Sequence, residues 1–282
     1  MSISSDNLFK QMSESFFVIC GPNVIESEDH VKYMIKELSR ICNELGILFI
    51  FKVSIDKANR TSIASYRGPG FMTGMNILKR IKELYPQIPI ITDVHESWQC
   101  EFIKEVVDII QIPAFLCRQT DLIESAAKTN KIIHIKKGQF CSIEVMNKCV
   151  EKIINCGNNK IILCERGTMF GYYDLIVDPR NIVLMRSINN LVTVDITHSL
   201  QQPSRINSDG TVSAGGIRSL IPTIGKVAVA AGVNGIFIEV HDRPNESKCD
   251  AATQWPLKKI GVLLNQLIKI DKLVKELDNI DI

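Results

Sequence analysis

Residues 16–53, FFVICGPNVIESEDHVKYMIKELSRICNELGILFIFKV, contain the pattern on which the fold prediction depends. Two short apolar runs, FFVIC (16–20) and ILFIFKV (47–53), flank the amphipathic stretch HVKYMIKELSRICNELG (30–46). Short apolar runs of this length are typical of buried strands, and the stretch between them has the spacing of a helix with one apolar face. The segment therefore predicts a strand, a helix and a second strand, the repeating unit of parallel α/β folds.

The same alternation continues along the chain. Six further apolar runs follow, separated for the most part by amphipathic stretches such as GMNILKRIKELYP. They are IPIIT (88–92), VVDIIQI (106–112), KIIHIK (131–136), KIILCE (160–165), LVTVDIT (191–197) and GIFIEV (235–240). Eight strand and helix repeats over about 250 residues predict a (β/α)8 barrel, with a doubly wound open sheet as the alternative. We expect residues 1–282 to form this single domain, with residues 1–15 as a short N-terminal extension.

The composition limits the classes of partner. The chain has 282 residues, 45% of them apolar, and 33 basic residues against 31 acidic ones, which gives a net charge of +2. This balance provides no electrostatic case for a nucleic acid or a membrane surface as partner. Nine cysteines, an odd number without a C-x-x-C pair, are typical of reduced thiols. With no signal-peptide pattern and no long apolar stretch, we expect a soluble, cytoplasmic protein.

Polar or charged residues follow seven of the eight predicted strands. In a (β/α)8 barrel the carboxyl ends of the strands meet at one mouth, where the site lies. These residues are Lys52, Asp93 and His95, Gln111, Lys136 and Lys137, Glu165 and Arg166, Asp195 and His198, and Glu239 and His241. Any one of them could be an ordinary polar residue at the start of a loop. Together they predict a single polar site.

Five of the cations near these strand ends would concentrate positive charge in a nearly neutral protein. They are Lys52, Lys57, Arg60, Lys136 and Arg166. Such a cluster suits phosphate or carboxylate groups, and its size indicates two anionic groups or two substrates. Two long polar segments, 199–218 and 241–256, follow the seventh and eighth strands and could be lids or ordinary surface loops.

These stretches resemble the 3-deoxy-D-manno-octulosonate 8-phosphate synthase family, whose members condense phosphoenolpyruvate with arabinose 5-phosphate. The resemblance covers about residues 16 to 270. It is carried by FFVICGPNVIES, FKVSIDKANRTSIASYRGPG, ITDVHE, DIIQIPAFLCRQTDL, IIHIKKGQF, ILCERGTMFGYYDLIVD, VTVDITHSLQQP and FIEVHDRPNESKCDAATQWPL. It implies a (β/α)8 barrel, usually a homotetramer, that acts on these two small molecules in the synthesis of the lipopolysaccharide inner-core sugar.

The resemblance also implies two substrate sites. The phosphoenolpyruvate pocket would be formed by Lys52, Gln111, Lys136 and Arg166, above the backbone of Pro113, Ala114 and Phe115. The stretch Lys57-Ala58-Asn59-Arg60-Thr61 resembles the family's sugar-phosphate motif, in which Asn59, Arg60 and Thr61 hold the aldose. A related synthase that uses erythrose 4-phosphate typically has Lys-Pro-Arg-Thr at this position. Ala58-Asn59 therefore favours arabinose 5-phosphate, and the four-carbon sugar remains the alternative.

The implied reaction joins C3 of phosphoenolpyruvate to the sugar aldehyde, adds water at C2 and releases phosphate by cleavage of its C–O bond. It needs groups that transfer protons near the water and the aldehyde oxygen. The candidates are Asp93, His95, His198, Glu239 and Asp250, and the sequence assigns them no separate roles. A catalytically silent barrel is a third hypothesis, which the loss of a strand-end charge would favour.

The family has a metal-dependent branch and a metal-independent branch. In the first, the ligands are a cysteine in the turn after the first strand, a histidine, a glutamate and an aspartate. The corresponding residues are Asn23, His198, Glu239 and Asp250. An amide oxygen binds first-row metals far more weakly than a thiolate does, so the resemblance implies that no metal cofactor is needed. We expect Asn23 to form hydrogen bonds there instead, to the aldehyde or to Asp250.

Two nearby positions bear on this prediction. Cys20 lies three residues before Asn23, inside the predicted strand, and is expected to be a core residue rather than a substitute ligand. The metal-independent branch usually has Cys-Asp-Gly after the eighth strand, where this chain has Cys249-Asp250-Ala251. The chain therefore combines parts of both patterns.

Overall fold

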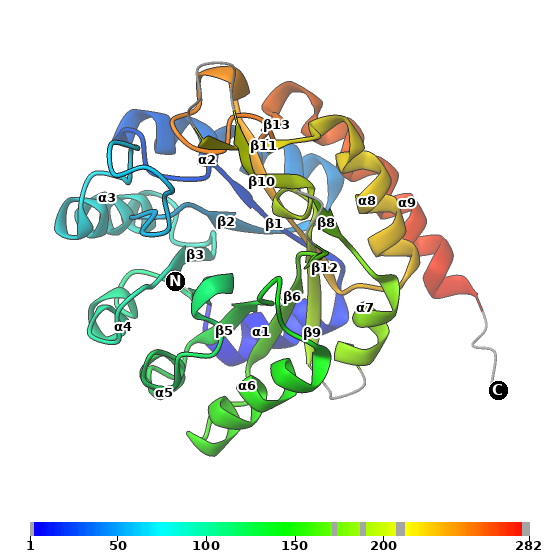
Figure 1. Cartoon of the computed structure of the whole chain (residues 1–282), viewed down its shortest axis with the longest axis horizontal. Helices are drawn as coiled ribbons and strands as arrows, with labels where there is room; N and C mark the ends of the chain where they lie inside the picture. The colour runs from blue at the N-terminus through cyan, green and yellow to red at the C-terminus, as the bar shows by residue number, and fades with distance from the viewer. Residues whose placement is uncertain (1–2, 171–173, 187–189, 207–211, 278–282) are drawn as a thin grey trace.

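In the computed structural model, eight parallel strands close into a barrel with helices around it (Figure 1). The structure describes residues 3–170, 174–186, 190–206 and 212–277. The barrel strands are β1 (Phe17–Gly21), β2 (Leu48–Lys52), β3 (Ile90–Asp93), β4 (Ile109–Ile112), β5 (Ile132–Lys136), β6 (Ile161–Glu165), β9 (Leu191–Asp195) and β12 (Gly235–His241). Each strand pairs with the next in this order, and β12 pairs with β1. The predicted (β/α)8 barrel is confirmed, and the open sheet is wrong.

Helices surround the barrel strands, and most of them connect one strand to the next (Figure 1). They are α1 (Ser5–Glu14), α2 (Glu28–Leu45), α3 (Phe71–Leu84), α4 (Gln99–Ile103), α5 (Thr120–Lys128), α6 (Ile143–Asn155), α7 (Pro179–Arg186), α8 (Ile221–Ala230) and α9 (Leu257–Glu276). Helix α2 begins after Ser27, whose hydroxyl accepts the N–H of His30, and ends at Gly46, which has a left-handed φ of 64°. Among the described helices, none combines the length and the apolar character needed to cross a membrane.

Strand β4 begins three residues later than its apolar run. The sequence predicts a strand from residue 106, but β4 begins at Ile109. The preceding Asp108 carboxylate accepts the backbone N–H of Ile90 at 2.8 Å and pairs with Lys82 Nζ at 2.7 Å. The Asp108 side chain therefore accepts the Ile90 N–H, which a backbone carbonyl of β4 would accept if the strand were longer.

The amino-terminal half of the barrel interior is filled by apolar side chains that point inward from alternate strand positions. This inner cluster consists of Phe17, Ile19, Ile50, Ile91, Ile109, Ile132, Ile162, Cys164, Leu191 and Phe237, together with Leu8 and Met12. Leu8 and Met12 belong to α1 and are fully buried. The N-terminal segment thus contributes a helix that seals the amino-terminal end of the barrel.

The intervening apolar residues of the strands point outward and pack against the helices. Cys20 is one of them, fully buried in the larger core cluster that joins the strands to the surrounding helices. The prediction that Cys20 is a core residue is confirmed.

The two long segments after β9 and β12 lie at the carboxyl end of the barrel. The first contains an antiparallel pair, β10 (Gln201–Ile206) and β11 (Val212–Gly216), whose connection lies outside the described residues. The second contains a 3₁₀ turn, Pro244–Glu246, and the short strand β13 (Trp255–Pro256), which pairs with β12. The lid motion suggested for these segments stays a prediction.

Candidate active site

A close backbone contact sets the position of Asn23. A Cβ atom on Gly21 would overlap the backbone carbonyl oxygen of Lys52, so the approach of β1 to β2 requires glycine. Beyond the strand, the backbone N–H of Ser54 donates to the carbonyl of Asn23 at 3.2 Å. The turn is thereby held against the end of β2, and the Asn23 side chain is 1% exposed.

The ring of Phe237 separates the apolar interior from a polar layer at the carboxyl ends of the strands. Lys136 Nζ lies 3.2 Å from the ring centroid, within cation–π range. His134 stacks on the same ring, with centroids 6.0 Å apart. The charged site is therefore built directly on an aromatic surface.

One hydrogen-bonded network joins β2, β3 and β4. Lys52 Nζ donates to Ser54 Oγ at 2.6 Å and lies 3.2 Å from Asp93 Oδ1. The Ser54 hydroxyl donates to Asp93 Oδ2 at 2.9 Å, and the Gln111 amide donates to Asp93 Oδ1. Burial lowers the pKa of Lys52 to about 8, although Asp93 favours its charged form.

A second network joins β5 and β9 around Asp195. Lys136 Nζ pairs with Asp195 Oδ2, and His198 Nδ1 lies 2.6 Å from the same oxygen. The other oxygen accepts the backbone N–H groups of Thr197 and His198 at 3.0 and 2.8 Å. Burial opposes the charged imidazole, but Asp195 and Glu239 outweigh it and raise the pKa of His198 to about 10. His198 is therefore a cation at neutral pH.

The third group contains the four residues of the family's metal position. Asn23 Nδ2 donates to Glu239 Oε2 at 2.5 Å and to Asp250 Oδ2 at 2.6 Å. His198 Nε2 lies 3.3 Å from the first oxygen and 3.5 Å from the second. Because ionised carboxylates only accept hydrogen bonds, the amide must present its NH₂ group to them. The predicted hydrogen bond between Asn23 and Asp250 is confirmed.

This arrangement is a poor fit for a transition metal. The donor atoms of His198, Glu239 and Asp250 lie within 4.8 Å of one another, which is close enough for three ligands. However, the Asn23 NH₂ group occupies the space between the two carboxylate oxygens and satisfies both of them. A cation there would have to displace these hydrogen bonds and would gain only a weak amide ligand in return.

The remaining cations reach the mouth from the loops. Lys57 Nζ lies 3.6 Å from Asp93 Oδ2 and 3.7 Å from Glu239 Oε1. Arg60 Nη1 donates to Cys249 Sγ at 2.5 Å and lies 3.7 Å from Asp250 Oδ1.

Arg166 is buried, and its Nη2 lies 3.3 Å from Gln201 Oε1. Together the mouth holds six basic side chains and four carboxylates, a surplus of positive charge. The residues are Lys52, Lys57, Arg60, Lys136, Arg166 and His198, with Asp93, Asp195, Glu239 and Asp250.

A cavity of about 70 Å³ lies between these groups. Its lining includes twelve residues, Lys57, Asn59, Asp93, Gln111, Pro113, Ala114, Lys136, Arg166, Asp195, His198, Phe237 and Glu239. Within the described part of the chain, four buried polar atoms beside it lack a hydrogen-bond partner: Asn23 Oδ1, Arg60 Nε, Arg166 Nη1 and Glu239 Oε1. Buried polar atoms are normally paired, so these four indicate a site for a polar ligand.

Seven predicted site residues do not line this cavity. Four of them still contact its lining or one another, namely Asn23, Lys52, Arg60 and Asp250. The other three lie apart from it. Thr61 is exposed, and Phe115 is 55% exposed next to Ala114. The His95 side chain is also absent from the cavity wall, and its backbone N–H donates to Gln99 Oε1 at 2.7 Å. The other predicted residues are brought together.

Three charged residues at strand ends point away from the mouth. Lys137 and Glu165 are fully buried outside the barrel interior, where Lys137 Nζ donates to the carbonyl of Gly167 at 3.1 Å. His241 turns towards the loop before α2, with Nε2 3.3 Å from Glu26 Oε1.

The sequence interpretation missed one interior polar residue. His134 is fully buried, with Nδ1 3.0 Å from Gln111 Oε1 and Nε2 3.0 Å from Thr193 Oγ1. It therefore connects Gln111 on β4 to Thr193 on β9. Its place two residues before Lys136, on the same face of β5, was the available signal.

Comparison with known proteins supplies the remaining observations. The family model described as "DAHP synthetase I family" matches residues 3–279. A protein of Arabidopsis thaliana named 2-dehydro-3-deoxyphosphooctonate aldolase 1 is 55% identical over 271 residues, covering 95% of this chain and 93% of that protein. Proteins named 2-dehydro-3-deoxyphosphooctonate aldolase are similar too: 46% identity in Fusobacterium nucleatum, covering 92% of each chain, and 42% in Glaesserella parasuis, covering 99% and 98%.

Proposed function

The chain belongs to the DAHP synthetase I family, and we propose that it is a 3-deoxy-D-manno-octulosonate 8-phosphate synthase. The reaction condenses phosphoenolpyruvate with D-arabinose 5-phosphate and water, and it yields 3-deoxy-D-manno-octulosonate 8-phosphate and inorganic phosphate. The observation that carries this proposal is the surplus of buried positive charge at the mouth of the barrel, in a chain that is similar over its length to enzymes of this name.

The first substrate would occupy the β4 to β6 side of the mouth. Lys136 and Arg166 would bind its phosphate and carboxylate, with Lys52 as a third cation and Gln111 as a hydrogen-bond donor. Pro113 and Ala114 line the cavity beside them. Arg166 Nη1 has no partner within the described residues, so the guanidinium is available to an anion.

The sugar phosphate would approach from the loop after β2. Asn59 lines the cavity, and Arg60 reaches Asp250 from the same loop. Arg60 and the exposed Thr61 would hold the phosphate, while Asn59 and Lys57 would contact the sugar nearer the reacting carbon. Ala58-Asn59 in this loop, together with the names of the relatives, favours the five-carbon aldose over erythrose 4-phosphate.

The bond between C3 of phosphoenolpyruvate and C1 of the aldose forms as negative charge develops on the aldehyde oxygen. The charged His198, positioned by Asp195, is a suitable proton donor to that oxygen. Water adds at C2, and phosphate then leaves by cleavage of the C2–O bond. Glu239 Oε1 accepts no hydrogen bond within the described residues and lies 3.7 Å from Lys57 Nζ. This carboxylate and Asp250 are placed to accept a proton from the water. Asp93 would keep Lys52 and Lys57 in place. His95, which does not line the cavity, would transfer protons from outside its wall.

The cavity of about 70 Å³ is much smaller than the roughly 300–1,000 Å³ typical of small-molecule sites. We propose that the segments after β9 and β12 move to admit the substrates and then close over them. The contact between Arg60 and Cys249 joins the loops after β2 and β12 and would have to open first.

Three further properties belong to this proposal. No divalent metal would be required, because the Asn23 amide already satisfies both carboxylates. The protein would act in the cytoplasm, where nine unpaired cysteines, eight of them buried, would stay reduced. A homotetramer would be the assembled form, as the family resemblance implies, and would act in the synthesis of the lipopolysaccharide inner-core sugar.

One assay tests the reaction and the metal together. Phosphate release from phosphoenolpyruvate is measured with arabinose 5-phosphate or with erythrose 4-phosphate, each with and without EDTA. We expect turnover with the five-carbon sugar that persists in EDTA. Turnover with the four-carbon sugar alone would contradict the substrate. Loss of activity in EDTA that Mn²⁺ or Zn²⁺ restores would contradict metal independence.

A further inference from the structure

A second group of histidines and carboxylates lies outside the mouth, where β12 meets the start of α2. Glu26 precedes α2, and His30 lies in its first turn. His241 is the last residue of β12, and Asp242 follows it. None of these four side chains lines the cavity of the proposed active site.

The distances within this group suit a metal site. One donor atom from each of Glu26, His30 and His241 lies within 4.8 Å of the other two. Glu26 Oε1 and His241 Nε2 are 3.3 Å apart. Two ligands bound at about 2.0–2.1 Å in a tetrahedral arrangement lie roughly 3.3 Å from each other, so these two atoms already have the required separation.

Two ring nitrogens in the group make no well-formed hydrogen bond with a described residue, although His241 Nε2 faces Glu26 Oε1 at 3.3 Å. In the part of the chain that the structure describes, His30 Nδ1 and His241 Nε2 are buried and have no hydrogen-bond partner. His241 is only 3% exposed, so water cannot readily satisfy its ring. A buried polar atom without a partner requires an explanation, and an unfilled ligand position supplies one.

Asp242 provides the supporting carboxylate that metal-binding histidines usually have. Its Oδ1 accepts His30 Nε2 at 3.0 Å, which leaves the lone pair of His30 on Nδ1. The same oxygen lies 3.1 Å from His241 Nδ1. One carboxylate oxygen thus faces the second nitrogen of both rings.

The ring proton of His241 must move for Nε2 to bind a metal. The backbone N–H of Arg243 donates to His241 Nδ1 at 2.9 Å, so without a cation the proton resides on Nε2. Binding would transfer it to Nδ1, where Asp242 Oδ1 can accept it in place of the Arg243 contact. The ring stays neutral, and no proton is released.

We propose that Glu26, His30 and His241 form a site for a divalent cation of the zinc type, with Asp242 orienting both histidines. Two imidazoles and one carboxylate are ligands that Zn²⁺ commonly takes, with water in the fourth position. The site differs from the group of His198, Glu239 and Asp250, because no side-chain amide of the described residues donates to two of its ligands at once, although Glu26 Oε1 accepts the backbone N–H of Lys248.

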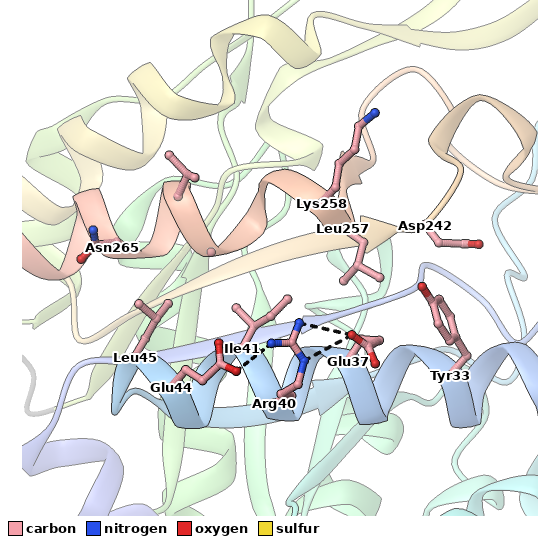
Figure 2. Close-up of a pocket in the computed structure, with 12 residues that line it drawn as sticks. Tyr33, Glu37, Arg40, Ile41, Glu44, Leu45, Asp242, Leu257, Lys258 and Asn265 are labelled. Carbon is pink, nitrogen blue, oxygen red and sulfur yellow. Dashed lines mark hydrogen bonds and ion pairs between the residues drawn. The ribbon is translucent and has the colours of Figure 1, made fainter.

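An ion can reach this site from the surface. Asp242 lies at one end of an open groove of about 600 Å³ between α2 and α9, which Figure 2 shows beside Tyr33 and Leu257. Glu26 and His30 are themselves partly exposed, with 15% and 14% of their side chains accessible.

Binding would also fasten a loop of the active site. The Glu26 carboxylate accepts the backbone N–H of Lys248 at 2.9 Å, and Ser247 Oγ lies 3.4 Å from it. These residues immediately precede Cys249 and Asp250. A cation on Glu26 would therefore hold the segment that carries Asp250.

The test measures zinc bound by the full-length, EDTA-treated protein in equilibrium dialysis against Zn²⁺ alone. The starting protein carries His198→Gln, which removes a ligand from the other group. We expect it to bind one Zn²⁺ per chain, and His30→Gln or Glu26→Gln to weaken that binding at least tenfold. Asp242→Asn should weaken it by about 10- to 100-fold. His95→Gln, a matched histidine replacement outside both groups, should leave it unchanged.

A further variant separates loss of a ligand from loss of structure. His30→Cys offers a thiolate in place of the imidazole and should retain zinc that His30→Gln loses, with both proteins compared by thermal unfolding in EDTA. Absence of zinc binding in the His198→Gln protein would overturn the proposal. So would binding that His30→Gln and Glu26→Gln leave at its original strength. Neither result depends on catalytic activity, so the proposed function is tested separately.

Discussion

Replacing Asn23 with cysteine should convert this site from one held by hydrogen bonds to one that binds a metal. The change removes the two hydrogen bonds that the amide donates to Glu239 and Asp250. Hydrogen bonds to charged groups contribute about 1.5–3 kcal/mol each, so the metal-free variant should lose at least about 3 kcal/mol of stability. At about 2–4 °C per kcal/mol for a chain of this size, the melting temperature should fall by roughly 6–12 °C.

Zinc should restore most of this loss in the cysteine variant. A thiolate at position 23 would complete a ligand set with His198, Glu239 and Asp250, whose donor atoms already lie within 4.8 Å of one another. A ligand present at 100 times its dissociation constant contributes about 2.7 kcal/mol, nearly the amount removed. Asn23→Ser is the matched control, because it loses the same amide but supplies no thiolate.

The measurement is thermal unfolding of both variants in EDTA and in excess Zn²⁺, with metal content determined after dialysis. A cysteine variant that melts in EDTA at the temperature of the unchanged protein would refute the energetic argument. Equal zinc effects on the cysteine and serine variants would refute the proposed geometry.

Three other substitutions test separate parts of the structure. Burial lowers the pKa of Lys52 to about 8, so its ammonium is charged below that pH and neutral above it. The KM for phosphoenolpyruvate should rise as the pH increases through about 8, and Lys52→Met should raise the KM and abolish this dependence in steady-state kinetics. Leu8→Ala should lower the free energy of unfolding by about 2–5 kcal/mol in denaturant titrations, and no change would show that α1 is not part of the core. His134→Ala leaves Gln111 Oε1 without its partner and should cost about 1–3 kcal/mol, whereas Thr193 Oγ1 keeps its contact with the Leu163 carbonyl at 3.4 Å. It should also raise the KM for phosphoenolpyruvate more than it lowers kcat, and the opposite pattern would count against a positioning role.

The barrel was predictable because each strand forms a separate apolar run of its own. The strand ends were also informative, since Lys52, Asp93, Gln111 and Lys136 all meet at the mouth as expected. The prediction was less accurate in deciding which of two adjacent strand-end residues points into the site. Successive residues on a strand point to opposite sides, so one step along the chain moves a side chain out of the site.

Lys136 and Lys137 illustrate this limit. Lys136 points into the barrel above Phe237, whereas Lys137 is buried behind it near Gly167. The two residues are adjacent, so their side chains point to opposite sides of the strand. The apolar run does not show which of the two faces the interior. His134 was missed for a related reason, because one histidine in an otherwise apolar strand has the same pattern whether it faces the helices or the interior.

The helix α1 could not be placed from its sequence. Its Leu8 and Met12 contact residues from strands distributed along most of the chain, and no local pattern encodes such a contact. The hydrogen bonds of Asn23 depend in the same way on Glu239 and Asp250, which lie more than 200 positions away.

The pairing of β1 with β12 has a consequence for synthesis on the ribosome. Phe17 pairs with Gly235, so the first strand to be made waits for a partner that is translated roughly 220 residues later. At about 5–20 residues per second, that interval lasts roughly 10–45 seconds. During this time the nascent chain exposes an unpaired apolar edge and the underside that α1 will cover. The emerging polypeptide should therefore depend on chaperones until the eighth barrel strand has left the exit tunnel.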